Sequence, residues 1–200
     1  MRHFLAALAL GGTAVAWAGG DVRKDSKEFQ YNVSGTTAQQ VLDDMRRQAQ
    51  RVGEDYFAEA KWRIDWRYDY DRPTRNACRV KDLRVYLTER VTLPHWTGAG
   101  AATALVAQWQ SFVAAVRQHE LGHLAHGRQA ANDVRDELQK LRARDCEILE
   151  QRADETGTSI VKRYAAMDVE YDARTEHGKT QGAWWTVEAP TRVAAPAPAR

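Results

Sequence analysis

Hydrophobic and polar residues alternate most regularly in the segment AKWRIDWRYDYD. Its apolar and aromatic side chains occupy every second position: Trp62, Ile64, Trp66, Tyr68 and Tyr70. A period of two is typical of a strand with one buried face. Leu83, Val85 and Leu87 repeat this pattern after the turn-forming segment RPTRNA. The sequence therefore predicts two antiparallel strands, of which the second ends before Pro94.

Most of the remaining pattern has the three- and four-residue spacing of amphipathic helices. A first helix is expected over residues 37–52, with Gly53 following its end. From about Gly100 an apolar stripe leads directly into His119; its members are Leu105, Trp109, Phe112, Val113 and Val116. Gly127 is expected to end or bend this helix. Two further helical segments follow, with stripes at Val134, Leu138, Leu141 and Ile148 and then at Ile160, Val161, Tyr164 and Met167.

The segments outside these elements are polar. DVRKDSKEFQ, residues 21–30, is dense in charge and is expected to form a loose leader before a short strand at Tyr31 and Val33. Near the other end, EYDARTEHGKTQGAWW is expected to be a loop, and residues 188–200 a disordered tail. One domain is predicted over residues 28–184.

The N-terminus has the pattern of an export signal. Residues 1–18 begin with Met1 and Arg2, continue with an apolar stretch, and end in the small-x-small sequence Ala-Trp-Ala. The apolar run is too short to span a bilayer, so we expect it to be removed rather than to anchor the protein. The mature chain is therefore expected in the periplasm or outside the cell.

Export changes the interpretation of the two cysteines, Cys78 and Cys146. In an oxidising compartment a lone pair of cysteines is usually bonded. The predicted disulfide would enclose the HELGH segment in a long loop, which the chain-entropy model values at about 4 kcal/mol.

Charge argues against one class of partner. The chain has 29 Lys and Arg against 27 Asp and Glu, a net charge of +2, with both signs mixed along its length. Nucleic-acid binding needs a one-sided basic surface, so no nucleic-acid partner is expected.

The segment HELGH, residues 119–123, carries the clearest chemistry. His119 and His123 are four residues apart, so on a helix they lie on one face and can bind one ion. Zinc prefers such nitrogen ligands, and it lowers the pKa of a bound water to about 7. Glu120 lies beside the histidines as a base for that water. His-Glu-x-x-His therefore predicts a catalytic Zn2+ site.

A catalytic zinc usually has three protein ligands, so a third must be found. His126 lies about 10.5 Å along a straight helix from the first histidine, so its participation would require the helix to break. Glu137 or Glu147 on the following helix would supply a carboxylate. The segment YDARTEHGKTQGA offers Asp172 and His177 in an expected loop. Among these candidates we prefer His177.

Several separated motifs occur here in the order found in a known family. They are YNVSGTT, WRIDWRY, CRV, LPHW, HELGH, the cysteine of the following helix, and YDARTEHGKTQGA. Through these motifs the chain resembles, over about residues 28–184, the bacterial family of predicted secreted zinc-dependent proteases. The resemblance implies a zincin-like metallopeptidase.

The resemblance also implies roles for individual residues. His119 and His123 correspond to zinc ligands and Glu120 to the catalytic acid/base, and the two cysteines are bonded to each other. The Thr-x-His-Gly element of the family falls on residues 175–178 and supports His177 as the third ligand.

The expected reaction is the hydrolysis of a peptide bond in a protein or peptide substrate. Glu120 would take the proton of a zinc-activated water and pass it to the leaving amine. Tyr171 or Thr175 is a candidate for stabilising the oxyanion.

Two alternatives to a catalytic zinc site stay open. One is a non-catalytic periplasmic binding or scaffolding domain with a structural zinc and four protein ligands. The other is a metal-free recognition surface built by the aromatic residues of segment 62–70.

The predicted fold is α+β and zincin-like. A small antiparallel sheet of two to four strands is expected to pack against the motif helix, with the other helices around it. The cleft is expected between the sheet edge and the motif helix, with residues 171–182 as its other wall.

Overall fold

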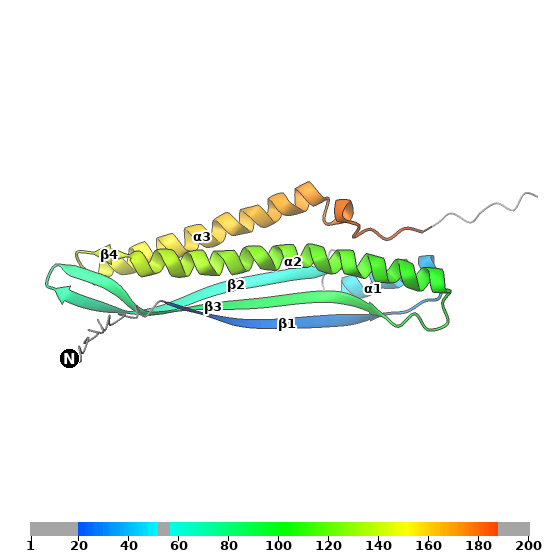
Figure 1. The fold of residues 1–200 in the computed structure, drawn as a ribbon, viewed down its shortest axis with the longest axis horizontal. Coiled ribbons are helices and arrows are strands. Elements are labelled where there is room, and N and C mark those ends of the chain that lie inside the picture. The colour runs from blue at the N-terminus through cyan, green and yellow to red at the C-terminus, as the bar shows by residue number, and fades with distance from the viewer. Residues whose placement is uncertain (1–19, 52–56, 188–200) are drawn as a thin grey trace, which may run out of the picture.

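The computed structural model describes residues 20–51 and 57–187 and shows an elongated α+β arrangement (Figure 1). Its elements are β1 (Asp21–Val33), α1 (Ala38–Arg51), β2 (Glu59–Thr74), β3 (Ala77–Trp96), α2 (Thr103–Lys140), β4 (Arg142–Ala143), α3 (Cys146–Thr175) and the short 3-10 helix η1 (Lys179–Gln181). The expected signal segment 1–18 and the expected tail 188–200 lie outside the described residues.

The sheet has the strand order β1-β3-β2, with β4 added to β3. The antiparallel pairing of β2 with β3 confirms the predicted hairpin. However, β1 runs parallel to β3, so the sheet is mixed and the expectation of a purely antiparallel sheet is wrong. The reason is the path of the chain: the tight turn between β2 and β3 brings β3 back between the two earlier strands, in the direction of β1.

Strand β1 includes the segment that the charge pattern predicts as a loose leader. Two of its inward-facing positions, Ser26 and Glu28, carry polar side chains, and these side chains find partners. Ser26 donates to Glu89 at 2.6 Å, and Glu28 accepts from Arg117 at 2.7 Å. The expectation of a leader is wrong because hydrogen bonds, which have no hydrophobic period, hold the inner face of β1.

Strand β3 continues past Pro94, beyond the end predicted from the sequence. Pairing with β2 stops at Thr92, whereas pairing with β1 runs on to Trp96. Beyond Thr92, β3 has a strand neighbour on one side only among the described residues, and a strand in that position tolerates the missing N–H of proline.

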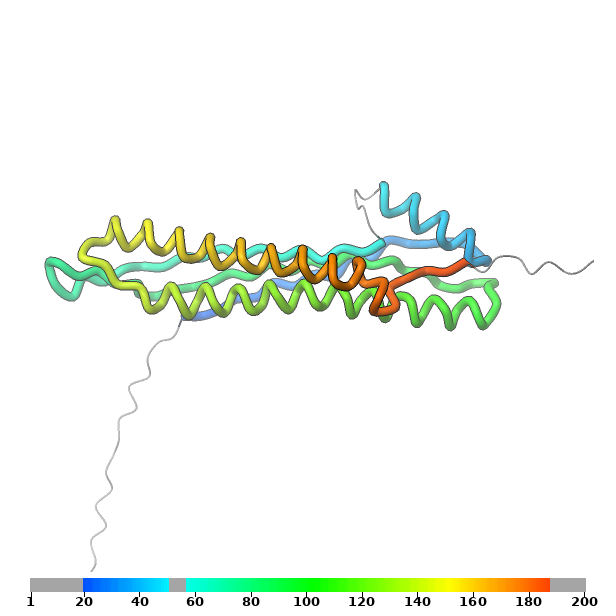
Figure 2. The backbone as a smooth tube through the Cα atoms, turned by 90° about the horizontal axis from the view of Figure 1, so that it is seen from above, coloured from blue at the N-terminus to red at the C-terminus, as the bar shows by residue number. Residues whose placement is uncertain are grey.

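The two long helices lie side by side over one face of the sheet (Figure 2). Helix α2 passes through Gly127 without ending there, so the expectation that the helix ends at this residue is wrong. Glycine is needed at this position because a Cβ would stand 2.6 Å from the ring of Trp62. A glycine costs a helix roughly 1 kcal/mol, and the close approach of the indole offsets that cost. None of the helices in the described ranges is long and apolar enough to cross a membrane.

Helix α3 differs from its prediction at both ends. The chain leaves α2 after Lys140, and Asp145 then caps α3 by accepting the N–H of Ile148 at 2.9 Å. At the other end α3 continues to Thr175, so the expectation of a loop from Glu170 is wrong for the first residues of that segment. Their helical spacing directs polar side chains toward α2, and this contact keeps them in the helix.

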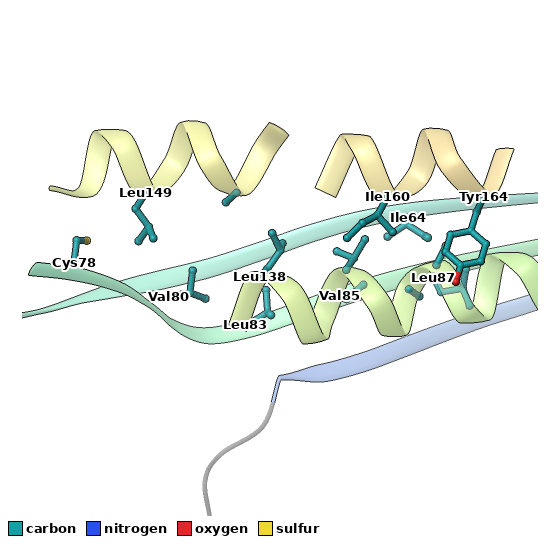
Figure 3. Close-up of a cluster of buried hydrophobic side chains, with 14 of the residues drawn as sticks. Ile64, Cys78, Val80, Leu83, Val85, Leu87, Leu138, Leu149, Ile160 and Tyr164 are labelled. Carbon is teal, nitrogen blue, oxygen red and sulfur yellow. The ribbon is translucent and has the colours of Figure 1, made fainter. Parts of the chain in front are cut away.

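Two groups of buried apolar residues follow one another along the length of the molecule. One joins α3, the C-terminal half of α2 and the β2–β3 hairpin (Figure 3). The other joins the N-terminal half of α2 to α1, to the ends of β1 and β3 and to Trp185. The predicted disulfide is present: Cys78 and Cys146 have an S–S distance of 2.08 Å and fasten the hairpin to the start of α3. Such a bond is typical of proteins in oxidising compartments.

Candidate metal centre

The HELGH segment lies near the middle of α2, which confirms that the motif is helical. His119, Glu120 and His123 are only 5%, 6% and 8% exposed. They are buried because α3 covers one side of α2 and strand β2 lies on another. The polar side chains of the motif are therefore part of an interface rather than a solvated helix face.

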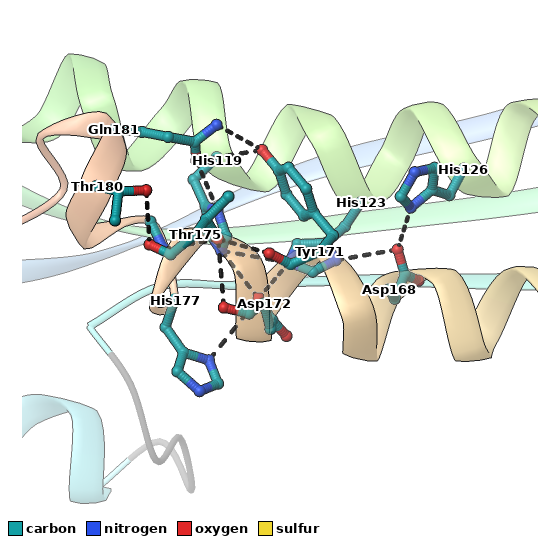
Figure 4. A network of polar contacts seen from close by, with 11 residues as sticks. His119, His123, His126, Asp168, Tyr171, Asp172, Thr175, His177, Thr180 and Gln181 are labelled. Carbon is teal, nitrogen blue, oxygen red and sulfur yellow. Dashed lines mark hydrogen bonds and ion pairs between the residues drawn. The ribbon is translucent and has the colours of Figure 1, made fainter.

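Asp172 of α3 brings a third donor atom to the two histidines (Figure 4). Its Oδ1 lies 3.1 Å from His119 Nε2 and 3.0 Å from His123 Nε2, and the two Nε2 atoms are 3.3 Å apart. Ligands of a tetrahedral zinc at about 2.0–2.1 Å lie roughly 3.3 Å from one another. The triangle of donor atoms therefore has the size of one face of a zinc tetrahedron.

The other ring nitrogen of each histidine has a hydrogen-bond partner of its own. His119 Nδ1 lies 3.0 Å from the amide oxygen of Gln181, and His123 Nδ1 lies 3.0 Å from a carboxylate oxygen of Asp168. Both oxygens accept hydrogen bonds, so they favour the tautomer of each ring that carries its proton on Nδ1 and has its lone pair on Nε2. Two lone pairs and a carboxylate oxygen so close together require a positive charge among them, from a metal ion or from added protons.

The two histidines differ in their electrostatic surroundings. Burial lowers the pKa of His119 and outweighs its hydrogen bond to Gln181. Burial also acts to lower the pKa of His123, but the hydrogen bond to Asp168 and the nearby carboxylates outweigh it and raise this pKa. The surroundings of His123 therefore favour positive charge on its ring.

Tyr171 holds His119 from the side of α3. Its ring stacks on the imidazole with 4.9 Å between centroids and 13° between planes. The hydroxyl exchanges hydrogen bonds with Gln181 at 3.0 and 3.2 Å. A side chain at Gly122 would meet the Tyr171 hydroxyl at 2.5 Å, so only glycine lets α3 come this close. The oxyanion role expected of Tyr171 stays a prediction, whereas its ring stacks directly on the imidazole of His119.

Glu120 points from the same turn of α2 toward strand β2. Burial raises the pKa of its carboxyl to about 7, partly offset by His123 and by a backbone hydrogen bond from Ala60. A carboxyl group whose pKa is raised toward neutrality can both take up and release a proton near neutral pH.

A left-handed turn follows α3 and completes this part of the molecule. Glu176, His177 and Gly178 have φ values of 49°, 52° and 81°. Thr175, whose hydroxyl accepts the N–H of Gly178 at 3.2 Å, braces the turn. The turn carries Gln181 to His119 and leaves the His177 side chain 47% exposed, with Nδ1 at 3.7 Å from Asp172 Oδ1.

The structure thus places the candidates for the third ligand differently. Asp172 belongs to the donor triangle, and His177 lies next to it at the surface. His126 instead points at Asp168, with Nδ1 at 2.7 Å from Oδ1. Glu137 pairs with a lysine on its own helix, and Glu147 is exposed in the first turn of α3.

Sequence reasoning missed Asp168 and Gln181 as members of this site. One signal was present in the chain: Asp168 and Asp172 are four residues apart, the same spacing as the two histidines of the motif. On facing helices, two such pairs can meet. The expected loop assignment of this segment hid the spacing.

These features define an α+β protein whose two long helices carry two buried histidines and one half-buried aspartate, a group that could hold a metal ion. A family model described as "Bacterial protein of unknown function (DUF922)" matches residues 29–178. The chain belongs to this family, whose description names no activity. Neither the curated proteins nor the solved structures gave a match.

Proposed function

We propose that this protein is an exported zinc-dependent hydrolase, and specifically a metallopeptidase. The observation that carries the proposal is the donor triangle of His119 Nε2, His123 Nε2 and Asp172 Oδ1, with sides of 3.3, 3.1 and 3.0 Å. Two imidazoles and one carboxylate are a common ligand set of catalytic zinc, which keeps its fourth position for water or substrate. The resemblance to predicted secreted proteases supports peptide hydrolysis, and the export signal expected in residues 1–18 supports the location.

The chemistry divides between the metal and the protein. Zinc bound at the triangle would supply Lewis acidity and lower the pKa of a bound water. Glu120 accepts the proton of the attacking water and returns it to the leaving amine. Tyr171 and Gln181 contact the ring of His119 and support its orientation.

The test compares Glu120→Gln with the unaltered mature protein. Glutamine has nearly the same shape and cannot accept the proton, so we expect about one zinc per chain in both proteins and hydrolysis of denatured casein only by the unaltered one. Zinc is measured by metal analysis after dialysis, and hydrolysis by release of labelled peptides. Equal hydrolysis by both proteins, or an absence of bound zinc in the unaltered protein, contradicts the proposal.

A non-catalytic domain with a structural zinc is the second candidate, favoured by the position of His177 only 3.7 Å from Asp172. A structural site has four protein ligands and no open position. Cobalt-substituted protein distinguishes the two candidates. Addition of acetohydroxamate changes the cobalt absorption spectrum if a position is open and leaves it unchanged if four side chains fill the site.

A further inference from the structure

Asp168 of α3 receives hydrogen bonds from α2 (Figure 4) and from β2. Its Oδ1 accepts from His123 Nδ1 at 3.0 Å and from His126 Nδ1 at 2.7 Å, both on α2. Its Oδ2 accepts from the indole Nε1 of Trp62 on β2 at 2.7 Å. The side chain is 20% exposed, and both of its oxygens are engaged.

The indole that holds Asp168 is itself held firmly. Trp62 lies on the inner face of β2 against Gly127 of α2, where an added Cβ would stand 2.6 Å from the ring. Its Nε1 is a donor with a single fixed direction. The carboxylate of Asp168 therefore accepts hydrogen bonds from Trp62 on the sheet side and from the two histidines on the α2 side, and these bonds limit the rotation of the carboxylate group.

The hydrogen bonds that hold Asp168 also affect His123. A carboxylate that accepts from Nδ1 selects the tautomer with its lone pair on Nε2, fixes the ring plane and makes the imidazole a stronger ligand. His126 shares the same oxygen but lies farther along α2, outside the donor triangle. Its role in this geometry is to hold Asp168 rather than to bind a metal.

We propose that Asp168, held by its hydrogen bond from Trp62, is the positioning residue that orients the ring of His123 for binding the metal. This inference rests on the proposed function, because it concerns how the proposed zinc ligands are held.

The variant Asp168→Asn tests the proposal. An amide can present its oxygen either to Trp62 or to the two histidines, but not to both, and it has no negative charge. We expect zinc affinity, measured by competition with a chromophoric chelator, to fall about 10- to 100-fold, the usual effect of removing such a supporting carboxylate. Trp62→Phe keeps the carboxylate of Asp168 but removes the indole N–H that donates to it, so a smaller loss of zinc affinity is expected.

Asp133 offers a matched control. It also accepts from three donors across the same two helices, namely Gln129, Arg163 and Tyr164, and it touches neither motif histidine. Asp133→Asn should leave zinc affinity unchanged while altering stability in a similar way. Wild-type zinc affinity in Asp168→Asn, or an equal loss in both variants, would overturn the proposal.

A second readout separates this inference from the proposed function. The tautomer of His123 is measured by long-range 15N–1H NMR in protein freed of metal. We expect the Nδ1–H form in the unaltered protein and a mixture of forms in Asp168→Asn. If the unaltered protein binds no zinc, the proposed function fails and this measurement still decides whether Asp168 positions the ring; identical tautomers in both proteins would refute that role.

Discussion

Gly122→Ala is a small change that tests how α3 approaches the motif helix. Gly122 lies within the HELGH segment, and a Cβ built on it would stand 2.5 Å from the Tyr171 hydroxyl oxygen and 2.6 Å from Cζ. Atoms this close must move apart. Since the neighbouring atom belongs to a stiff ring that stacks on His119, the displacement should reach the candidate metal ligand.

Two opposing effects determine how much Gly122→Ala changes the free energy of unfolding. Replacing glycine by alanine inside a helix stabilises it by about 1 kcal/mol. Overpacking a filled interface costs roughly 1–3 kcal/mol. We therefore expect a net loss of about 0–2 kcal/mol, which for a chain of this size lowers Tm by up to about 8 °C. Zinc affinity should fall about tenfold or more, because Tyr171 no longer supports the ring of His119.

Gly157→Ala is the matched control for this experiment. It lies in α3, where an added Cβ would stand 2.6 Å from the ring of Trp66, so the helix gain and the steric cost are alike. Thermal unfolding should show similar losses for the two variants. Chelator competition should show weaker zinc binding for Gly122→Ala alone. Wild-type affinity together with raised stability in Gly122→Ala would refute the reasoning, since it would mean that Tyr171 does not press on this position.

Three further predictions concern other parts of the molecule. Asp172→Asn should weaken zinc binding beyond the roughly 10- to 100-fold typical of supporting residues, whereas His177→Ala should change it only a few-fold; the reverse order would make His177 the third ligand. Replacing Cys78 and Cys146 together by serine should cost about 4 kcal/mol in urea unfolding, because their bond closes a loop over a sequence separation of 68; an unchanged midpoint would show that the bond constrains little. Burial acts to raise the pKa of Glu89, but its hydrogen bonds to an arginine and a serine outweigh this and lower the pKa below 4.5. The contribution of Glu89 to the free energy of unfolding is therefore complete above that pH and is lost as the pH falls through the folded-state pKa. The stability difference between the unaltered protein and Glu89→Gln should therefore shrink in acid, and a difference independent of pH would contradict this.

The sequence by itself determined those features that depend on residues close together in the chain. The period of two in segment 62–70 and at Leu83–Leu87 indicated the hairpin, and the apolar stripe before His119 placed the motif on a helix. His119, Glu120 and His123 could be identified as a group because a helix fixes the relation between residues four apart. The disulfide followed from having only two cysteines in a chain with an export pattern.

Only the tertiary structure decided which distant residues meet. The contact between α2 and α3 brings Asp172 to the motif histidines, 53 and 49 positions away in sequence, and no local period records such a contact. The inner face of β1 was hidden for a related reason, since its polar side chains are satisfied by partners on β3 and α2. Hydrophobic periodicity reports burial against apolar neighbours, whereas hydrogen bonds between distant segments leave no period in the sequence. The donor triangle and its support by Asp168 depend on such contacts between distant segments, so only the tertiary structure could show them.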